Sequence, residues 1–190
     1  VAIVDAEGHT TTLAWAGHLP VEVTDATGVT STLSYDDHGD LVAIEDAAGH
    51  RATLDRDAVG RIVAATTPLG HRTTYTWAGE LLASRTDPDG AVWHYEYSPA
   101  GRPVAVVDPL GHRTTWEHDD SGEGGVMTDA LGRRTTRVLD DLGNLAAIEL
   151  PDGTRWQYTH DALSRLVART DPDGSTWRWE YDVNGAPAQV

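Results

Sequence analysis

Glycine recurs along this chain at a nearly constant interval, and this periodicity constrains the fold more than any other feature. Successive members of one glycine series are separated by 20 or 21 residues. We call them the first-turn glycines: Gly8, Gly28, Gly49, Gly70, Gly90, Gly111, Gly132, Gly153 and Gly174. A fixed period of this length is typical of repeat architectures, in which each unit packs on its neighbours. The sequence therefore predicts nine copies of one unit.

A second series of turn residues lies between the first-turn glycines. It consists of Gly17, Gly39, Gly60, Gly79, Gly101, Gly122, Gly143, Ser164 and Gly185, with serine in one glycine position. First turns such as Asp-Pro-Asp-Gly (87–90) have the residues that a tight turn prefers. We expect the second turns, such as Tyr-Asp-Asp-His-Gly (35–39), to be looser, and those ending at Gly17 and Gly79 to be shortened.

The segments between the turns are short and rich in Thr, Val, Trp and Tyr, which favour β-strands. No stretch has helical periodicity, so we predict an all-β fold of tandem β-hairpin repeats in one antiparallel sheet ribbon. About 18 strands spaced by about 4.8 Å make a sheet too wide to remain flat, so the ribbon is expected to curl. The predicted repeats are 1–20, 21–41, 42–62, 63–82, 83–103, 104–125, 126–145, 146–166 and 167–187. We expect the whole chain, 1–190, to be a segment of a longer protein.

The aromatic residues all lie three, five or seven positions after a first-turn glycine. Because side chains alternate between the faces of a strand, this spacing places them on one side of the sheet. This aromatic stripe comprises Trp15, Tyr35, Tyr75, Trp77, Trp93, Tyr95, Tyr97, Trp116, Trp156, Tyr158, Trp177, Trp179 and Tyr181. The opposite face is predicted to be polar, with residues such as Arg72 and Thr74.

Composition excludes several classes of function. The 190 residues carry 30 acidic and 14 basic side chains, a formal charge of −16, which opposes charge-driven binding to nucleic acid. There is no cysteine and no long apolar run, so disulfides, thiolate sites and membrane insertion are not expected. Many acidic residues are turn aspartates, so the charge mainly reflects turn chemistry.

The repeat units resemble a known family. Segments 97–103 (Tyr-Ser-Pro-Ala-Gly-Arg-Pro) and 160–166 (His-Asp-Ala-Leu-Ser-Arg-Leu), and the turn at 170–174 (Thr-Asp-Pro-Asp-Gly), resemble the tyrosine–aspartate (YD) repeats of Rhs proteins. Similar repeats occur in toxin-complex shell subunits and teneurins. The Tyr-Asp pair itself is present only at 35–36 and 181–182.

This resemblance implies a function for the segment. It implies part of a hollow β-shell in a large secreted or surface bacterial protein, with the rest of the shell and an encapsulated cargo domain, typically a C-terminal toxin, as partners. Rhs shells are cleaved at paired Asp-Pro-x-Gly-Leu motifs. Segment 108–111 matches only Asp-Pro-Leu-Gly and is followed by His112, so we interpret it as an ordinary turn.

No catalytic, cofactor or metal site is expected. His9, His50, His71 and His112 each follow a first-turn glycine, but equivalent positions are about 9–10 Å apart, too far to share one zinc ion. The Asp-x-Asp-Gly turns at 87–90 and 171–174 supply too few oxygens at one point for calcium. Paired turn carboxylates, such as those of Asp36 and Asp37, lack the cleft that a glycosidase needs.

One alternative function belongs to a different class. Rows of Trp and Tyr on a sheet can stack on sugar rings, so the aromatic stripe could form a carbohydrate- or cell-surface-binding module. The stripe recurs in the repeats rather than concentrating at one place, which favours a structural role.

Overall fold

The computed structural model describes residues 1–122, 124–182 and 185–188. Residues 1–93 and 94–190 form two compact units, which we treat separately. Every regular element in the described residues is a β-strand, and all described strand pairs are antiparallel, which confirms the predicted all-β hairpin fold. Among these residues, no helix is long and apolar enough to cross a membrane.

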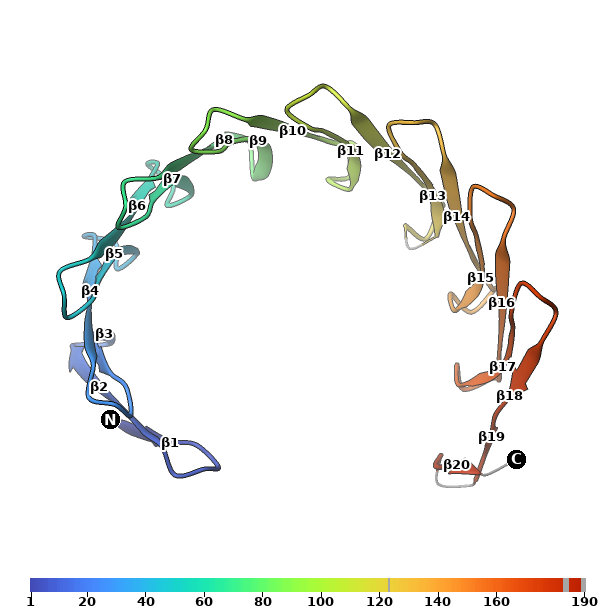
Figure 1. Ribbon diagram of the computed structural model, residues 1–190, viewed down its shortest axis with the longest axis horizontal. Helices are drawn as coiled ribbons and strands as arrows, with labels where there is room; N and C mark the ends of the chain where they lie inside the picture. Colours follow the sequence, from blue (N-terminus) through green and yellow to red (C-terminus); the bar gives the residue numbers. More distant parts are fainter. Residues whose placement is uncertain (123, 183–184, 189–190) are drawn as a thin grey trace. The chain divides into compact units, whose positions relative to one another are not determined.

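In the first unit, each strand pairs with the next one along the chain (Figure 1). Its strands are β1 (Ala2–Val4), β2 (Thr10–Ala16), β3 (Leu19–Thr24), β4 (Thr30–Tyr35), β5 (Leu41–Glu45), β6 (Arg51–Arg56), β7 (Ile62–Thr66), β8 (Arg72–Ala78) and β9 (Leu81–Thr86). The sheet bends steadily toward one face, as expected for a wide, twisted ribbon.

The second unit has the same meander arrangement. β10 (Val92–Tyr97) contains the division between the units, and its residues from His94 onward pair with β11. The strands that follow are β11 (Pro103–Val107), β12 (Arg113–His118), β13 (Gly125–Thr128), β14 (Arg134–Leu139), β15 (Leu145–Glu149), β16 (Arg155–His160), β17 (Leu166–Thr170) and β18 (Thr176–Arg178). A separate pair, β19 (Glu180–Tyr181) and β20 (Pro187–Ala188), follows them.

First and second turns have the same backbone geometry, so the expectation of looser second turns is wrong. In the first turn at 46–50, the Gly49 N–H donates to the Asp46 carbonyl and the Asp46 N–H to the His50 carbonyl, both at 3.0 Å. The second turn at 36–40 repeats both bonds at 3.0 Å. Each is a three-residue hairpin loop that ends in a left-handed residue. The two turns look different in sequence because only the first turns contain Asp-Pro-Asp-Gly. Both 46–49 and 36–39, however, have the pattern Asp-x-x-Gly, which forms the same loop.

The two shortened second turns are confirmed. Ala16 pairs with Leu19 and Ala78 with Leu81, so each hairpin has a two-residue loop that begins at Gly17 or Gly79. Both glycines have positive φ, 64° and 61°, as a type II′ turn requires. Ser164 also adopts the glycine conformation of its position, with φ of 60°, and it is the one non-glycine residue with positive φ in the described part of the chain.

The best-buried residues lie on the polar face. Four alanines at equivalent strand positions, Ala43, Ala64, Ala105 and Ala147, are the hydrophobic residues classed as buried in the described chain, at 1–2% exposure. Ala64 pairs with Asp55 on one side and Thr74 on the other, which places it opposite the aromatic stripe. The long polar side chains of neighbouring strands cover these small residues. On the aromatic face, by contrast, no large side chain of the described residues is fully buried.

Candidate functional surface: the aromatic face

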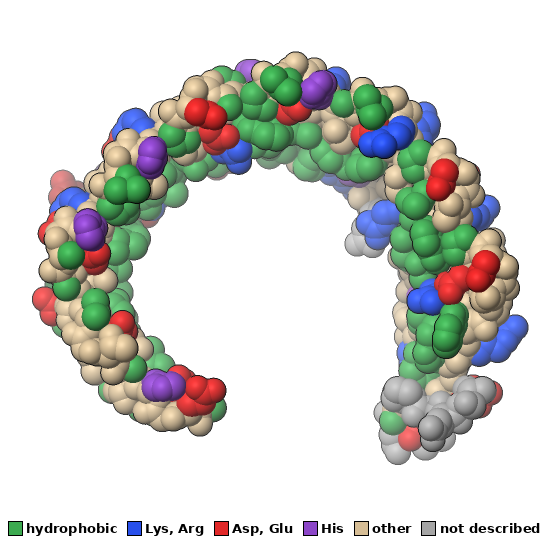
Figure 2. Space-filling view, viewed as in Figure 1, with side chains coloured by type: hydrophobic (Ala, Val, Ile, Leu, Met, Phe, Trp, Pro, Cys, Tyr) green, Lys and Arg blue, Asp and Glu red, His purple; other side chains and the backbone are tan. Residues whose placement is uncertain are grey.

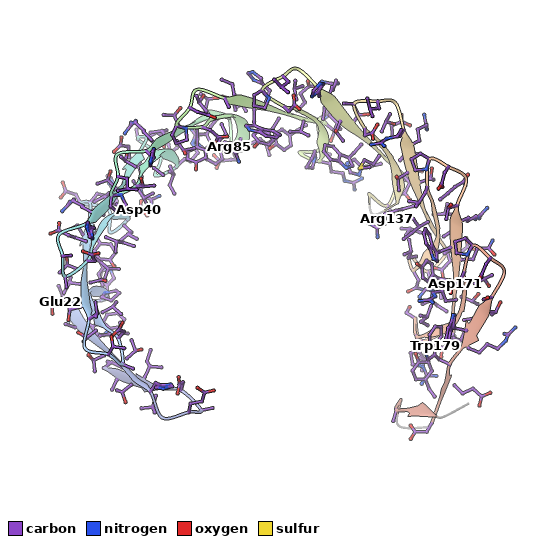
Figure 3. The ribbon with its side chains drawn as sticks, viewed as in Figure 1. Glu22, Asp40, Arg85, Arg137, Asp171 and Trp179 are labelled. Carbon is purple, nitrogen blue, oxygen red and sulfur yellow. The ribbon has the colours of Figure 1, made fainter. Side chains whose placement is uncertain are left out.

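Hydrophobic side chains gather on the concave side of each unit's sheet (Figure 2), which we call the inner face. Arg85, which pairs with Tyr75 of the aromatic stripe, is labelled on this side in Figure 3. Strand pairing supports this assignment of faces, because Trp77 opposes Leu82 and Tyr95 opposes Val106. The stripe residues are half-buried, except Trp15 and Trp177, which are 46% and 57% exposed. Strand pairing places stripe residues such as Tyr75, Tyr95 and Trp156 on the same face as Arg85, Val106 and Ile148, and no second layer of the described chain covers that face.

The last inner-face residue of several repeats forms a hydrogen bond with the preceding repeat. The Tyr35 hydroxyl donates to the Pro20 carbonyl at 2.7 Å, and the Trp77 indole N–H donates to the Ile62 carbonyl at 2.9 Å. The regular β3–β4 pairing ends at Glu22 and Thr32, so the Pro20 carbonyl lies beyond the ladder. A side-chain donor therefore satisfies a backbone acceptor that the sheet leaves open.

Other residue types perform the same task at the same position. Equivalent donors are Arg56 to Leu41, His118 to Pro103 and Tyr181 to Leu166, each reaching a carbonyl 15 residues earlier. The aromatic spacing predicts the tyrosines and the tryptophan as stripe residues, but it does not reveal Arg56 and His118. Their 21-residue spacing from Tyr35 and from Tyr97, respectively, was the signal that could have revealed them.

Two repeats contain an identical cluster of arginine, aspartate and tryptophan. In the first unit, Arg85 forms a two-point ion pair with Asp87 at 2.9 Å, and the Trp93 indole N–H donates to the same carboxylate at 3.2 Å. In the second unit, Arg169, Asp171 and Trp177 repeat this arrangement. In each cluster the guanidinium lies over the indole ring, 5.4 Å and 5.9 Å from its centroid.

These clusters change which aspartate stabilises the turn. In most turns the first aspartate accepts two backbone N–H groups, as Asp36 does from His38 and Asp40. In the Asp-Pro-Asp-Gly turns the first carboxylate is engaged by arginine and tryptophan, and the second one, Asp89, accepts the Ala91 N–H instead. Both aspartates thus have partners in or directly beside the hairpin that the turn closes.

Hydrogen bonding also affects the ionisation of the turn aspartates. The backbone N–H of Asp40 holds the pKa of the Asp36 carboxyl below its ordinary value, and the N–H of Arg133 does the same for Asp129. A carboxylate that accepts such bonds is stabilised in its charged form. These groups are ordered turn acceptors, and their lowered pKa values are opposite to what a general acid needs at neutral pH.

The histidines considered as metal ligands lie apart from one another in separate turns. Nδ1 of His9, His50 and His112 lies 2.8–3.1 Å from the carboxylate of the aspartate that begins the same turn. The backbone N–H of His71 donates to the Thr67 hydroxyl. No group of three His, Asp or Glu side chains in the described ranges is placed to hold a metal ion.

Charged strand residues are segregated between the two faces. By strand pairing, the carboxylates within β1–β18 all lie on the outer face: Glu22, Glu45, Asp55, Glu96, Glu117 and Glu149. The inner face has the strand arginines Arg56, Arg85, Arg137 and Arg169. Figure 3 shows Arg85 and Arg137 on the concave side of their units and Glu22 on the convex side. Although the chain is strongly acidic, the Asp, Glu and Arg residues that β1–β18 place on the inner face of each unit are all arginines.

Comparison with protein families gives matches across most of the chain. The model of the family described as RHS Repeat matches residues 15–52, 35–72, 78–113, 140–176 and 161–190, which together make up well over half of the sequence. No curated protein sequence matches the chain.

Several solved structures are similar to the chain in fold. A crystal structure of TcdB2-TccC3-Cdc42 matches with 14% identity and a TM-score of 0.44, covering 96% of this chain and 15% of that one. The Tc holotoxin pore of Photorhabdus luminescens matches with 13% identity and a TM-score of 0.44, covering 98% and 15%. A porin-like protein from Bacteroides uniformis matches with 10% identity and a TM-score of 0.40, covering 94% and 91%. The chain spans about 15% of the length of the first two.

Proposed function

Since the chain belongs to the RHS repeat family, we propose that it is a wall segment of a hollow shell whose inner face encloses a cargo polypeptide. The carrying observation is the inner face of each unit, a row of mostly half-buried aromatic and aliphatic side chains that no second layer of the described residues covers. Large apolar surfaces of this kind are uncommon on proteins that work alone and mark places where another chain packs. A cargo inside a shell would be such a chain.

The proposed role is mechanical, and it requires no reaction by this segment. We propose that the parent protein is secreted or displayed at a bacterial surface and that the cargo is a C-terminal toxin domain. The neighbouring parts of the same shell would continue the strand ladder at both ends of the segment. The hydrogen bonds from strand-end residues such as Tyr35 and Trp77 to the preceding repeat support a wall that must remain closed.

Limited proteolysis of the full parent protein tests this role. The cargo domain should be degraded at least about tenfold more slowly within the parent protein than when it is expressed alone. A matched pair of variants assigns the effect to the inner face: Tyr75→Glu places a charge on the inner face of β8, and Thr76→Glu places one on its outer face. Protection should fall in the first variant and persist in the second. Equal cleavage of enclosed and free cargo would contradict the proposal.

Carbohydrate binding remains the second candidate, because Trp15 and Trp177 are the most exposed aromatic residues. Several stripe rings, however, already have an arginine over one face: Arg61 on Trp77, Arg85 on Trp93 and Arg169 on Trp177. A ring occupied in this way has one less face for stacking on sugar. Tryptophan fluorescence during titration with bacterial polysaccharide distinguishes the two functions: saturable quenching supports the carbohydrate module, and an unchanged spectrum supports the wall.

A further inference from the structure

The repeat between Gly111 and Gly132 differs from the others at the start of β13, the strand that follows its second turn. We call the strand in this position of each repeat the return strand. Its second turn contains an additional residue, and glycines occupy positions 122, 124 and 125. Elsewhere the return strand begins with aliphatic residues, as in Leu41-Val42 of β5. A Cβ atom at Gly125 would collide with the Glu117 carbonyl, so no side chain fits at this point of close backbone approach. Gly124 and Gly125 thus stand where β5 begins with larger aliphatic residues.

A cavity of about 460 Å³ lies at this irregular repeat. Trp116, Met127, Thr135 and Arg137 contribute to it from the inner face, together with Gly124 and Gly125. Strand pairing aligns Trp116, Met127 and Thr135 across three adjacent strands, and it pairs Gly125 with Arg137. Arg137 and its cross-strand neighbour Gly125 therefore both border the cavity. The cavity lies entirely within the second unit.

Arg137 differs from the other arginines of the inner face strands. Arg56 donates to backbone carbonyls, and Arg85 and Arg169 form ion pairs with turn aspartates. Arg137 is exposed and has no hydrogen bond or ion pair with any residue in the described ranges. It is labelled on the concave side of β14 in Figure 3.

The other polar side chains at or near the cavity, within the described ranges, have partners elsewhere. Glu117 belongs to the outer face, where its carboxylate lies 3.8 Å from Arg134. Nε2 of His118 lies 2.6 Å from the Pro103 carbonyl. Asp119 accepts the Ser121 hydroxyl and the Gly122 N–H. The Trp116 indole N–H has no hydrogen bond with a described residue and is a second available donor.

We propose that this cavity binds a carboxylate next to an apolar side chain in an extended acidic segment of the enclosed polypeptide. The proposal rests on the cargo-enclosing function above. The Arg137 guanidinium would bind the carboxylate with two parallel N–H donors, and Trp116 and Met127 would contact the apolar neighbour. The occupant follows from charge complementarity, since the inner-face strands carry arginines and no carboxylate in the described residues.

Fluorescence polarisation with labelled octapeptides tests the site on the full chain. The probes alternate leucine with glutamate, with glutamine or with lysine. The glutamate peptide should bind about tenfold more tightly than the glutamine peptide, which is the ratio expected for about 1.4 kcal/mol of charge-assisted hydrogen bonding. Arg137→Gln should remove this difference, and Arg137→Glu should shift the preference to the lysine peptide. Far-UV circular dichroism checks that each variant is folded.

Arg155→Gln is the matched control, because Arg155 is an exposed arginine on the outer face of β16. It removes the same charge and should leave peptide binding unchanged. Equal weakening by Arg137→Gln and Arg155→Gln would overturn the proposal, because it would show attraction to net charge alone. Binding of an oligosaccharide that Arg137→Gln abolishes would overturn it too. If the cargo is protected from proteolysis but the peptides do not bind, only this site is contradicted. If the peptides bind but the cargo is not protected, only the enclosing function is contradicted.

Discussion

Arg72 on β8 forms an ion pair with Asp55 on β6, with Nη2 and Oδ2 2.7 Å apart, although β7 runs between the two strands. The pair spans the outer face at Ala64, the β7 residue that lies opposite Asp55. In the second unit, Arg113 and Glu96 form the same connection across β11 at Ala105. At these two positions, the small side chain of the buried alanine leaves room for the two long side chains to meet above it.

The coupling between Arg72 and Asp55 should be measurable but small. Both side chains are about half-exposed, at 51% and 49%, so solvent screens their attraction. We expect a double-mutant cycle with Arg72→Ala and Asp55→Ala to give a coupling free energy of about 0.2–1 kcal/mol at low salt. Urea denaturation of the four proteins measures it. The coupling should decline in 1 M NaCl, and a salt-independent value would contradict an electrostatic origin.

The small size of Ala64 is a separate requirement. Replacing Ala64 with leucine should separate Arg72 from Asp55 and destabilise the chain by about 1–3 kcal/mol, a typical cost of overpacking. Ala65→Leu is the control, because Ala65 is half-buried on the inner face of the same strand, which no second layer of the described residues covers. Denaturation midpoints of the two variants provide the comparison. Equal destabilisation would show that the position above β7 has no special constraint.

Removing the Tyr35 hydroxyl should weaken the contact between successive repeats. Tyr35→Phe deletes the donor to the Pro20 carbonyl but keeps the aromatic ring, so we expect a loss of about 1 kcal/mol in the free energy of unfolding. Tyr75→Phe is the matched control, since the Tyr75 hydroxyl forms no hydrogen bond with a described residue. Its unfolding free energy should change by less than about 0.5 kcal/mol. A cost that is the same for both variants would contradict the role of the hydrogen bond.

The sequence predicted the repeat, the strand class and the shared face of the aromatic residues because each depends on local spacing. A glycine that requires positive φ recurs wherever the hairpin closes, and alternation along a strand determines the face. The buried alanines could not be predicted in this way. Their burial depends on side chains from neighbouring strands, such as Arg72 and Asp55, whose register the sequence does not state.

The surface chemistry was also only partly predictable. Periodicity located Tyr35 and Trp77, but the hydrogen bond that they share with Arg56 and His118 depends on where the strand ladder ends. The cavity beside Arg137 lies at the repeat whose second turn has an additional residue. The glycine periodicity does not reveal it, because Gly111 and Gly132 keep the regular spacing of 21 residues.

Acid should destabilise the fold through its turn aspartates. Because the pKa values of Asp36 and Asp129 are lowered in the folded state, their contribution is present above the ordinary carboxyl pKa of about 3.9 and is lost as pH falls through the lowered values. We expect the midpoint of urea denaturation to fall between pH 5 and pH 2.5. An unchanged midpoint over this range would contradict the role of the charged carboxylates.

Ser164 offers a position at which the chain can be made more stable. Its φ of 60° is left-handed, which costs a residue with a Cβ atom about 1–2 kcal/mol, whereas glycine adopts it readily. Ser164→Gly should raise the unfolding free energy by about 0.5–1 kcal/mol, because the greater freedom of glycine in the unfolded chain offsets part of the gain. The reciprocal control is Gly143→Ser in the preceding repeat, where φ is 83° and an added Cβ would have no atom within 4 Å. It should destabilise by a similar amount, and the measurement is thermal and urea denaturation of both variants. If Ser164→Gly were neutral while Gly143→Ser was costly, serine at position 164 would have to form a compensating interaction, and strain would not be its main effect.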